Sequence, residues 1–190
     1  KGLHVRGIHS KIPFLFQADL ELINAANEVK LDFVGLSFVR NNTDINDAKK
    51  LIDNDILVIP KVETLSAVKN IDEILTNNEY ILVDRGDLST DVGLEKVPIF
   101  QNYIIQKANE HKKGYFLATQ FLKNMELKPL PTIAEINDLY NTFLLPNISG
   151  IQLSEETAVG KFPQDCLDVL NLMIDETTKI KSIDSIIKKL

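Results

Sequence analysis

The chain has 190 residues, 44% of them hydrophobic and 25% charged, which is the composition of a globular protein with one substantial core. Its net charge of −6, without a basic stripe, excludes a surface that binds nucleic acid or an anionic membrane. The single cysteine, Cys166, excludes a disulfide framework and suits a reducing compartment. No apolar run is long enough to span a membrane and no signal-peptide pattern opens the chain, so we expect a cytoplasmic protein.

Along the chain one pattern repeats, an apolar β-rich run followed by an amphipathic helix. The expected strands lie within residues 30–40, 55–63, 80–88, 114–122 and 150–158. The expected helices are residues 17–29, ahead of the first strand, and then 45–53, 64–75, 95–111, 132–145 and 162–180. These five strand–helix units predict an α/β fold around a parallel sheet. Because the chain begins with Lys1 and not with Met, we expect it to be part of a longer polypeptide.

Polar residues follow the strands, which is where TIM barrels place their sites, but by itself this placement predicts only the α/β class. Flat doubly wound sheets usually carry a glycine-rich phosphate loop, and the sequence contains neither G-x-G-x-x-G nor G-x-x-x-x-G-K-[ST]. Five strand–helix units are fewer than the eight that a closed barrel needs. The missing strands would therefore come from upstream sequence or from another chain.

The second expected strand ends on a cation and an anion. Lys61 and Glu63 are two residues apart, so strand geometry places both side chains on one face. Asp87 follows the next strand, and we expect Glu63 and Asp87 to hold a divalent ion, Mg²⁺ or Mn²⁺, because carboxylates from neighbouring strands suit hard cations. Lys61 would stabilise negative charge on a phosphoryl oxygen or an enolate.

The segment "RGDLSTD" begins a helical turn, and its free backbone N–H groups, near the flexible Gly86, form a seat for a substrate carboxylate. The fourth expected strand ends on Thr119, and the fifth is followed by "SEET". Each feature alone is also typical of a solvated strand end or a helix cap, but their occurrence at successive strand ends favours a site. For Arg40, after the first strand, a structural and a functional role are both open.

Four segments, "KVETLSAVKNIDEIL", "VDRGDL", "ATQFLKNMELKPLPTIAEINDLYN" and "LSEETAVGKFP", resemble the pyruvate kinase family. The family patterns, in the same order, are K-I-E-N at a strand end, V-A-R-G-D-L-G, A-T-Q-M-L with K-P-x-P-T-x-A-E, and L-S-G-E-T-A-x-G-x-Y-P. The resemblance covers roughly residues 1–175. It implies a TIM barrel of the phosphoenolpyruvate/pyruvate type, of which residues 1–190 form one partial catalytic domain without the family's lid and C-terminal regulatory domains.

The resemblance also implies an activity, the Mg²⁺-dependent transfer of a phosphoryl group from phosphoenolpyruvate to ADP, which yields pyruvate and ATP. Carried over by position, Lys61 would face the transferring phosphoryl group, and Glu63 and Asp87 would bind the metal. The backbone of Gly86 and Asp87 would hold the substrate carboxylate, with Thr119 beside it near the face of proton delivery.

A further catalytic residue implied by the resemblance is Glu156, which would lie at the rim and orient a network of hydroxyl groups and water. Val159 stands where the family has a lysine near the nucleotide phosphates, and Glu155 stands where it has glycine, so the use of ADP and ATP is left open. Leu130 and Ile133 replace two arginines that help to build the family's subunit interface, so assembly into a homo-oligomer is also open.

Residues of the family that lie upstream of this chain supply a substrate arginine and a monovalent-cation site, so a need for K⁺ is undecided and the fragment alone is not expected to turn over. Two other functions remain open. Pyruvate-dependent aldolases and citrate-lyase-type enzymes have a similar Glu and Asp metal pair. A noncatalytic relative that retains the fold and the metal pair is the third hypothesis, which Val159 and Glu155 favour.

Overall fold

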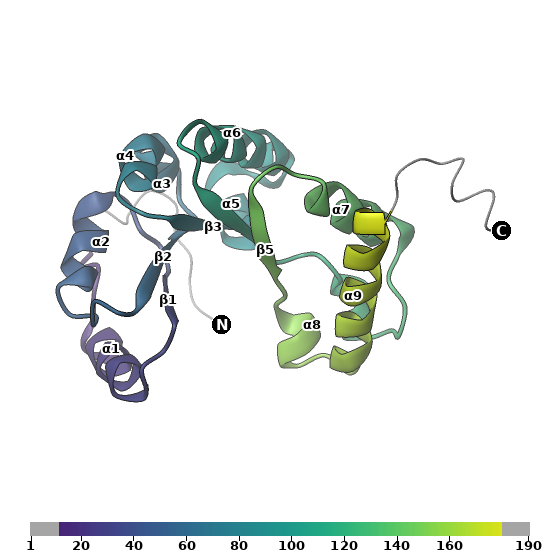
Figure 1. Ribbon diagram of the computed structural model, residues 1–190, viewed down its shortest axis with the longest axis horizontal. Helices are drawn as coiled ribbons and strands as arrows, with labels where there is room; N and C mark the ends of the chain where they lie inside the picture. Colours follow the sequence, from purple (N-terminus) through teal and green to yellow (C-terminus); the bar gives the residue numbers. More distant parts are fainter. Residues whose placement is uncertain (1–11, 180–190) are drawn as a thin grey trace. The chain divides into compact units, whose positions relative to one another are not determined.

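A computed structural model describes residues 12–179 of the chain (Figure 1). The expectations for "KGLHVRG" and for the basic segment after residue 179 lie outside the described residues. Among residues 12–179, no helix combines the length and the apolar character that crossing a membrane requires.

The strands are short and follow one another in space in the order of the sequence. They are β1 (Phe33–Leu36), β2 (Leu57–Val62), β3 (Tyr80–Asp84), β4 (Gly114–Ala118) and β5 (Ile148–Gln152), in a sheet of order β1-β2-β3-β4-β5. The pairs β1–β2, β2–β3 and β3–β4 are parallel. A doubly wound sheet reverses its strand order at a switch point, whereas this order does not reverse. The predicted α/β class and partial TIM barrel are therefore confirmed.

The expected helices are present, whereas two short helices, residues 85–92 and 155–158, overlap segments expected as strands, and one expected helix is divided. The helices are α1 (Gln17–Val29), α2 (Asn42–Lys49), α3 (Leu65–Lys69), α4 (Ile71–Thr76), α5 (Arg85–Val92), α6 (Val97–Glu110), α7 (Ile133–Phe143), α8 (Glu155–Ala158) and α9 (Pro163–Lys179), with 3₁₀ turns η2 (Leu94–Lys96) and η3 (Lys123–Glu126). The single helix expected at residues 64–75 is two helices. They meet at Asn70, whose φ of −103° and ψ of 18° are not helical and whose side chain donates to the Arg40 carbonyl.

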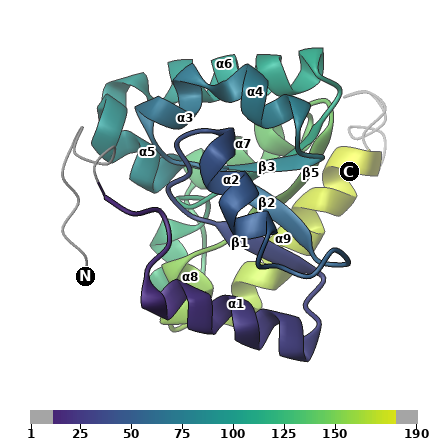
Figure 2. The same cartoon turned by 90° about the vertical axis from the view of Figure 1, so that its left-hand side faces the viewer.

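The described residues divide into two compact units, residues 12–118 with 149–151, and residues 119–148 with 152–179. In the first unit, α4 and α6 lie side by side over the strands (Figure 2), and side chains such as Leu75, Ile81 and Ile104 are fully buried. Burial of both strand faces explains why the strands read as continuous apolar runs. In the second unit, α9 packs against α7 and η3, and Met125 of η3 and Cys166 of α9 are buried.

Candidate functional site

Lys61 and Glu63 point to the same side of β2, as strand periodicity predicts. Nζ of Lys61 lies 2.6 Å from Oε1 of Glu63, and the side chains are 17% and 0% exposed. The ammonium also donates to Oγ of Ser37, just after β1, at 3.3 Å. The end of β2 is therefore an enclosed ion pair and not a solvated strand end.

The turn after β1 anchors the second oxygen of Glu63. The backbone N–H of Phe38 donates to Oε2 of Glu63 at 2.6 Å, and Phe38 has a φ of 54°, which is uncommon for a bulky residue. Burial raises the pKa of Glu63 to about 7, although the Lys61 charge and this hydrogen bond oppose the rise. Glu63 is therefore a carboxylate that gains a proton near neutral pH when no metal is bound.

Asp84, the last residue of β3, is part of the same cluster, and the sequence analysis missed it. Its Oδ2 lies 3.4 Å from Nζ of Lys61. Its Oδ1 accepts hydrogen bonds from the backbone N–H groups of Gly86 at 3.2 Å and of Asp87 at 3.3 Å, so Asp84 is the N-cap of α5. These are the two N–H groups that were predicted to seat a substrate carboxylate.

Glu63, Asp84 and Asp87 each offer an oxygen within 4.8 Å of the other two. The two predicted metal ligands therefore do lie together, and a third carboxylate joins them. Oε1 of the fully buried Glu63 accepts no hydrogen bond from the described residues, which leaves it available to a cation beside its ion pair. Closely spaced carboxylate oxygens fit a hard divalent ion such as Mg²⁺ or Mn²⁺.

Lys61 lies between these acidic groups. Burial disfavours its charged form, but the negative charges of Glu63 and Asp84 outweigh burial, so the pKa of Lys61 is raised. Lys61 is thus a fixed positive charge throughout the physiological pH range, which suits stabilisation of an anion and does not suit proton transfer.

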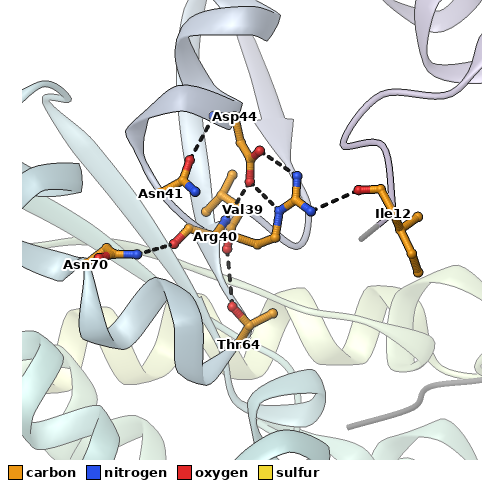
Figure 3. Close-up of polar contacts among 7 residues, drawn as sticks. All are labelled: Ile12, Val39, Arg40, Asn41, Asp44, Thr64 and Asn70. Carbon is orange, nitrogen blue, oxygen red and sulfur yellow. Dashed lines mark hydrogen bonds and ion pairs between the residues drawn. The ribbon is translucent and has the colours of Figure 1, made fainter. Parts of the chain in front are cut away.

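Arg40 has a structural role, one of the two that the sequence left open (Figure 3). Its guanidinium forms two 2.7 Å hydrogen bonds with the carboxylate of Asp44 and donates to the carbonyl of Ile12 at 2.9 Å. In the same network, the hydroxyl of Thr64 donates to the Val39 carbonyl at 3.3 Å. The network fixes the β1–α2 turn, and with it the Phe38 amide that contacts Glu63.

Thr119 and Gln120 follow β4 with φ values of 69° and 64°. Two successive non-glycine residues at positive φ are strained, most of all at a β-branched residue, and such strain gathers at functional sites. The Thr119 N–H is bonded to the carbonyl of Gln152 at 3.1 Å, which holds the conformation. Both residues are assigned to the second unit, so the predicted position of Thr119 beside the substrate stays a prediction.

Glu156 also belongs to the second unit and is fully buried, whereas the sequence predicted a position at the rim. Its carboxylate accepts hydrogen bonds from the backbone N–H of Ser154 at 2.8 Å and of Leu122 at 3.3 Å. These bonds hold the side chain in its buried position. Val159 is 73% exposed, and Glu155 lies 3.7 Å from the Lys123 ammonium.

Among the site residues that were not predicted, only Asp84 could have been recognised from the sequence. Asp84 stands where the family pattern V-A-R-G-D has alanine, and the spacing of Asp84 and Asp87 places two carboxylates at one strand end. The amide of Phe38 and the hydroxyl of Ser37 carry no signal, because the turn conformation alone brings them to Glu63 and Lys61.

Comparisons with known proteins identify the family of the chain. The family model of the pyruvate kinase barrel domain matches residues 1–167. The pyruvate kinases of Thermococcus litoralis and Methanocaldococcus jannaschii are each 36% identical over 173 residues, which is 90% of this chain and 36% and 38% of those proteins. That of Dictyostelium discoideum is 33% identical over 185 residues, 96% of this chain and 36% of its own length. The chain thus spans little more than a third of these relatives, and it belongs to the pyruvate kinase family.

Proposed function

We propose that the protein to which this chain belongs transfers the phosphoryl group of phosphoenolpyruvate to ADP, with a divalent metal ion. The observation that carries the proposal is the convergence of Glu63, Asp87 and Lys61 in one cluster at the strand ends of a pyruvate kinase barrel. Phosphoryl transfer depends mainly on positioning and on charge stabilisation, and these groups supply both. Residues 1–190 would be one part of the catalytic barrel, with the lid and regulatory domains elsewhere.

Glu63 and Asp87 would hold Mg²⁺ or Mn²⁺. The carboxylate oxygens of both residues lie within 4.8 Å of one another, and the side chain of Glu63 is fully buried. A bound divalent ion would neutralise charge on phosphoryl oxygens. Lys61, held as a cation by its acidic neighbours, would face the transferring phosphoryl group and then the enolate oxygen.

The remaining roles follow from the family resemblance. The N–H groups of Gly86 and Asp87 would hold the substrate carboxylate at the start of α5, and Thr119 would lie beside it. The strained backbone at Thr119 supports a functional position. Glu156 would act through the loop backbone that its carboxylate holds, which makes it a positioning residue. We leave open a requirement for K⁺ and assembly into a homo-oligomer.

The test is pyruvate formation from phosphoenolpyruvate and ADP by the full-length protein, with and without Mg²⁺ and K⁺. We expect metal-dependent turnover that is lost in Asp87→Asn and in Lys61→Ala. Asp91→Asn, on the same helix but bonded to the Leu65 amide, is a matched control that should retain turnover. Turnover that persists in Asp87→Asn would overturn the metal assignment.

A second candidate is a relative that binds metal and enolate but does not transfer phosphoryl groups. Val159 and Glu155 favour it, because neither supplies the positive charge or the open backbone expected near nucleotide phosphates. A carbon–carbon lyase of the pyruvate aldolase type would share the metal pair. For both, we expect no turnover with ADP alongside Mg²⁺-dependent binding of oxalate, a planar mimic of the pyruvate enolate.

A further inference from the structure

The amides at the start of α5 already have an anionic partner within the chain. Oδ1 of Asp84 accepts from the N–H of Gly86 and of Asp87, while Oδ2 lies 3.4 Å from Nζ of Lys61. A substrate carboxylate held by these amides and attracted by this ammonium would make the same three contacts. The side-chain carboxylate of Asp84 therefore occupies the position that the carboxylate of a ligand would take.

We infer that Asp84 is a specificity-determining residue that competes, from within the chain, with the carboxylate of the substrate. The inference rests on the proposed function, because it concerns the ligand of that same site. To bind in the seat, a carboxylate ligand must displace Asp84 from the amides of Gly86 and Asp87. The bonds of 3.2 and 3.3 Å are at the long end for N–H···O hydrogen bonds, so displacement is feasible but costs binding free energy.

The charge of Asp84 acts in the same direction. With Glu63 and Asp87 alone, one bound divalent cation and the Lys61 ammonium would leave the cluster with one positive charge, which attracts an anionic ligand. The additional carboxylate of Asp84, which is 5% exposed, removes that excess. Charges in a buried cluster are weakly screened, so the negative charge of Asp84 weakens the electrostatic attraction between the cluster and a ligand carboxylate.

An ordinary N-cap explains only part of this geometry. A capping aspartate needs only one oxygen at the helix amides. Here the second oxygen faces Lys61 inside the cluster, next to the fully buried Oε1 of Glu63 that accepts no hydrogen bond from the described residues. The cap and the candidate cation position thus share one cluster of side chains, and a carboxylate ligand at the α5 amides must approach that cluster.

The test is the affinity of the full-length protein for oxalate at saturating Mg²⁺, measured by isothermal titration calorimetry. Asp84→Ala frees both amides and removes the charge, so we expect oxalate to bind at least about tenfold more tightly. Asp84→Asn removes the charge but retains a capping oxygen, so we expect a smaller gain, about threefold. Asp91→Asn, on the same helix outside the cluster, should leave the affinity unchanged.

Oxalate affinity that is unchanged or weaker in both Asp84 variants would overturn the inference. Weaker Mg²⁺ binding in these variants would also overturn it, since Asp84 would then be a metal ligand. If Asp84→Ala does not fold, Asp84→Asn decides alone, because it retains the cap. Failure of the proposed function has a different signature, which is the absence of pyruvate formation together with oxalate binding that does not respond to Asp87→Asn.

Discussion

The backbone N–H of Phe38 reaches Oε2 of Glu63 at 2.6 Å from a left-handed conformation with a φ of 54°. A non-glycine residue in that region is strained by about 1–3 kcal/mol, and the surrounding structure must hold it there. The Arg40 network does so, because it fixes the turn that contains Phe38. The carboxylate of Glu63 is thus oriented by a backbone N–H group of the turn that follows β1.

Phe38→Gly should relieve this strain without removing the amide. Glycine adopts positive φ freely, so we expect the free energy of unfolding to stay within about 1 kcal/mol of the wild type. Mg²⁺ affinity should be unchanged, because the hydrogen bond comes from the backbone. Urea unfolding and calorimetry measure the two quantities. A marked loss of Mg²⁺ affinity would mean that the aromatic side chain, and not only the amide, supports the site.

The raised pKa of Glu63 makes metal-free stability depend on pH. Its pKa is about 7 in the folded protein, against 4.5 as the ordinary value, so between these values the folded state binds more protons than the unfolded state. The contribution of Glu63 is full below pH 4.5 and is lost as the pH rises through about 7, by on the order of 3 kcal/mol. Glu63→Gln should remove this part of the pH dependence in urea unfolding at pH 5 and 8. An equal change in the free energy of unfolding between pH 5 and pH 8 in both proteins would contradict this prediction.

Lys61→Met should move the pH range of metal binding upward. The charge of Lys61 lowers the pKa of Glu63, so without it Glu63 stays protonated to higher pH and must lose that proton before a metal binds. We expect the midpoint of Mn²⁺ affinity against pH to rise by about one unit or more. Lys113→Met, which removes a lysine paired with Glu79, is the control and should leave the midpoint in place.

Arg40→Ala should destabilise the first unit through the partner that it leaves behind. Asp44 is 5% exposed and would become a buried charge without its bidentate partner, which costs about 2–4 kcal/mol. Lys50→Ala breaks an ion pair with Asp47 that has the same 2.7 Å distance but is exposed, and should cost at most about 0.5 kcal/mol. Equal losses in the free energy of unfolding would show that burial of the Arg40 pair contributes nothing.

Glu156→Ala should destabilise the second unit, since the N–H groups of Leu122 and Ser154 lose their acceptor inside the protein. One buried donor and one partly buried donor without an acceptor cost on the order of 2–3 kcal/mol. Glu155→Ala, one residue earlier and exposed, should change stability by less than about 0.5 kcal/mol. Hydrogen exchange at the two amides separates this role from catalysis, because a catalytic residue without a structural role would leave their protection intact.

Much of the fold and part of the site could be predicted from the sequence. Near-continuous apolar strands and helices with apolar residues three and four apart identify the strand–helix units, because these patterns are local. The facing of Lys61 and Glu63 follows from strand period two, and the pairing of Glu63 with Asp87 follows from the rule that parallel strands end at one edge. The family resemblance rests on motifs that are contiguous in the chain.

The tertiary structure decided what depends on contacts between distant residues. The sequence shows Asp84 as a departure from the family pattern at a strand end, but only folding turns its two oxygens toward the α5 amides and Lys61. The Phe38 amide meets Glu63 because of a strained turn, and Arg40 is structural because Asp44 and the Ile12 carbonyl surround it. Local sequence fixes secondary structure and residue type, whereas burial, pKa and hydrogen-bond partners arise only when separate segments pack together.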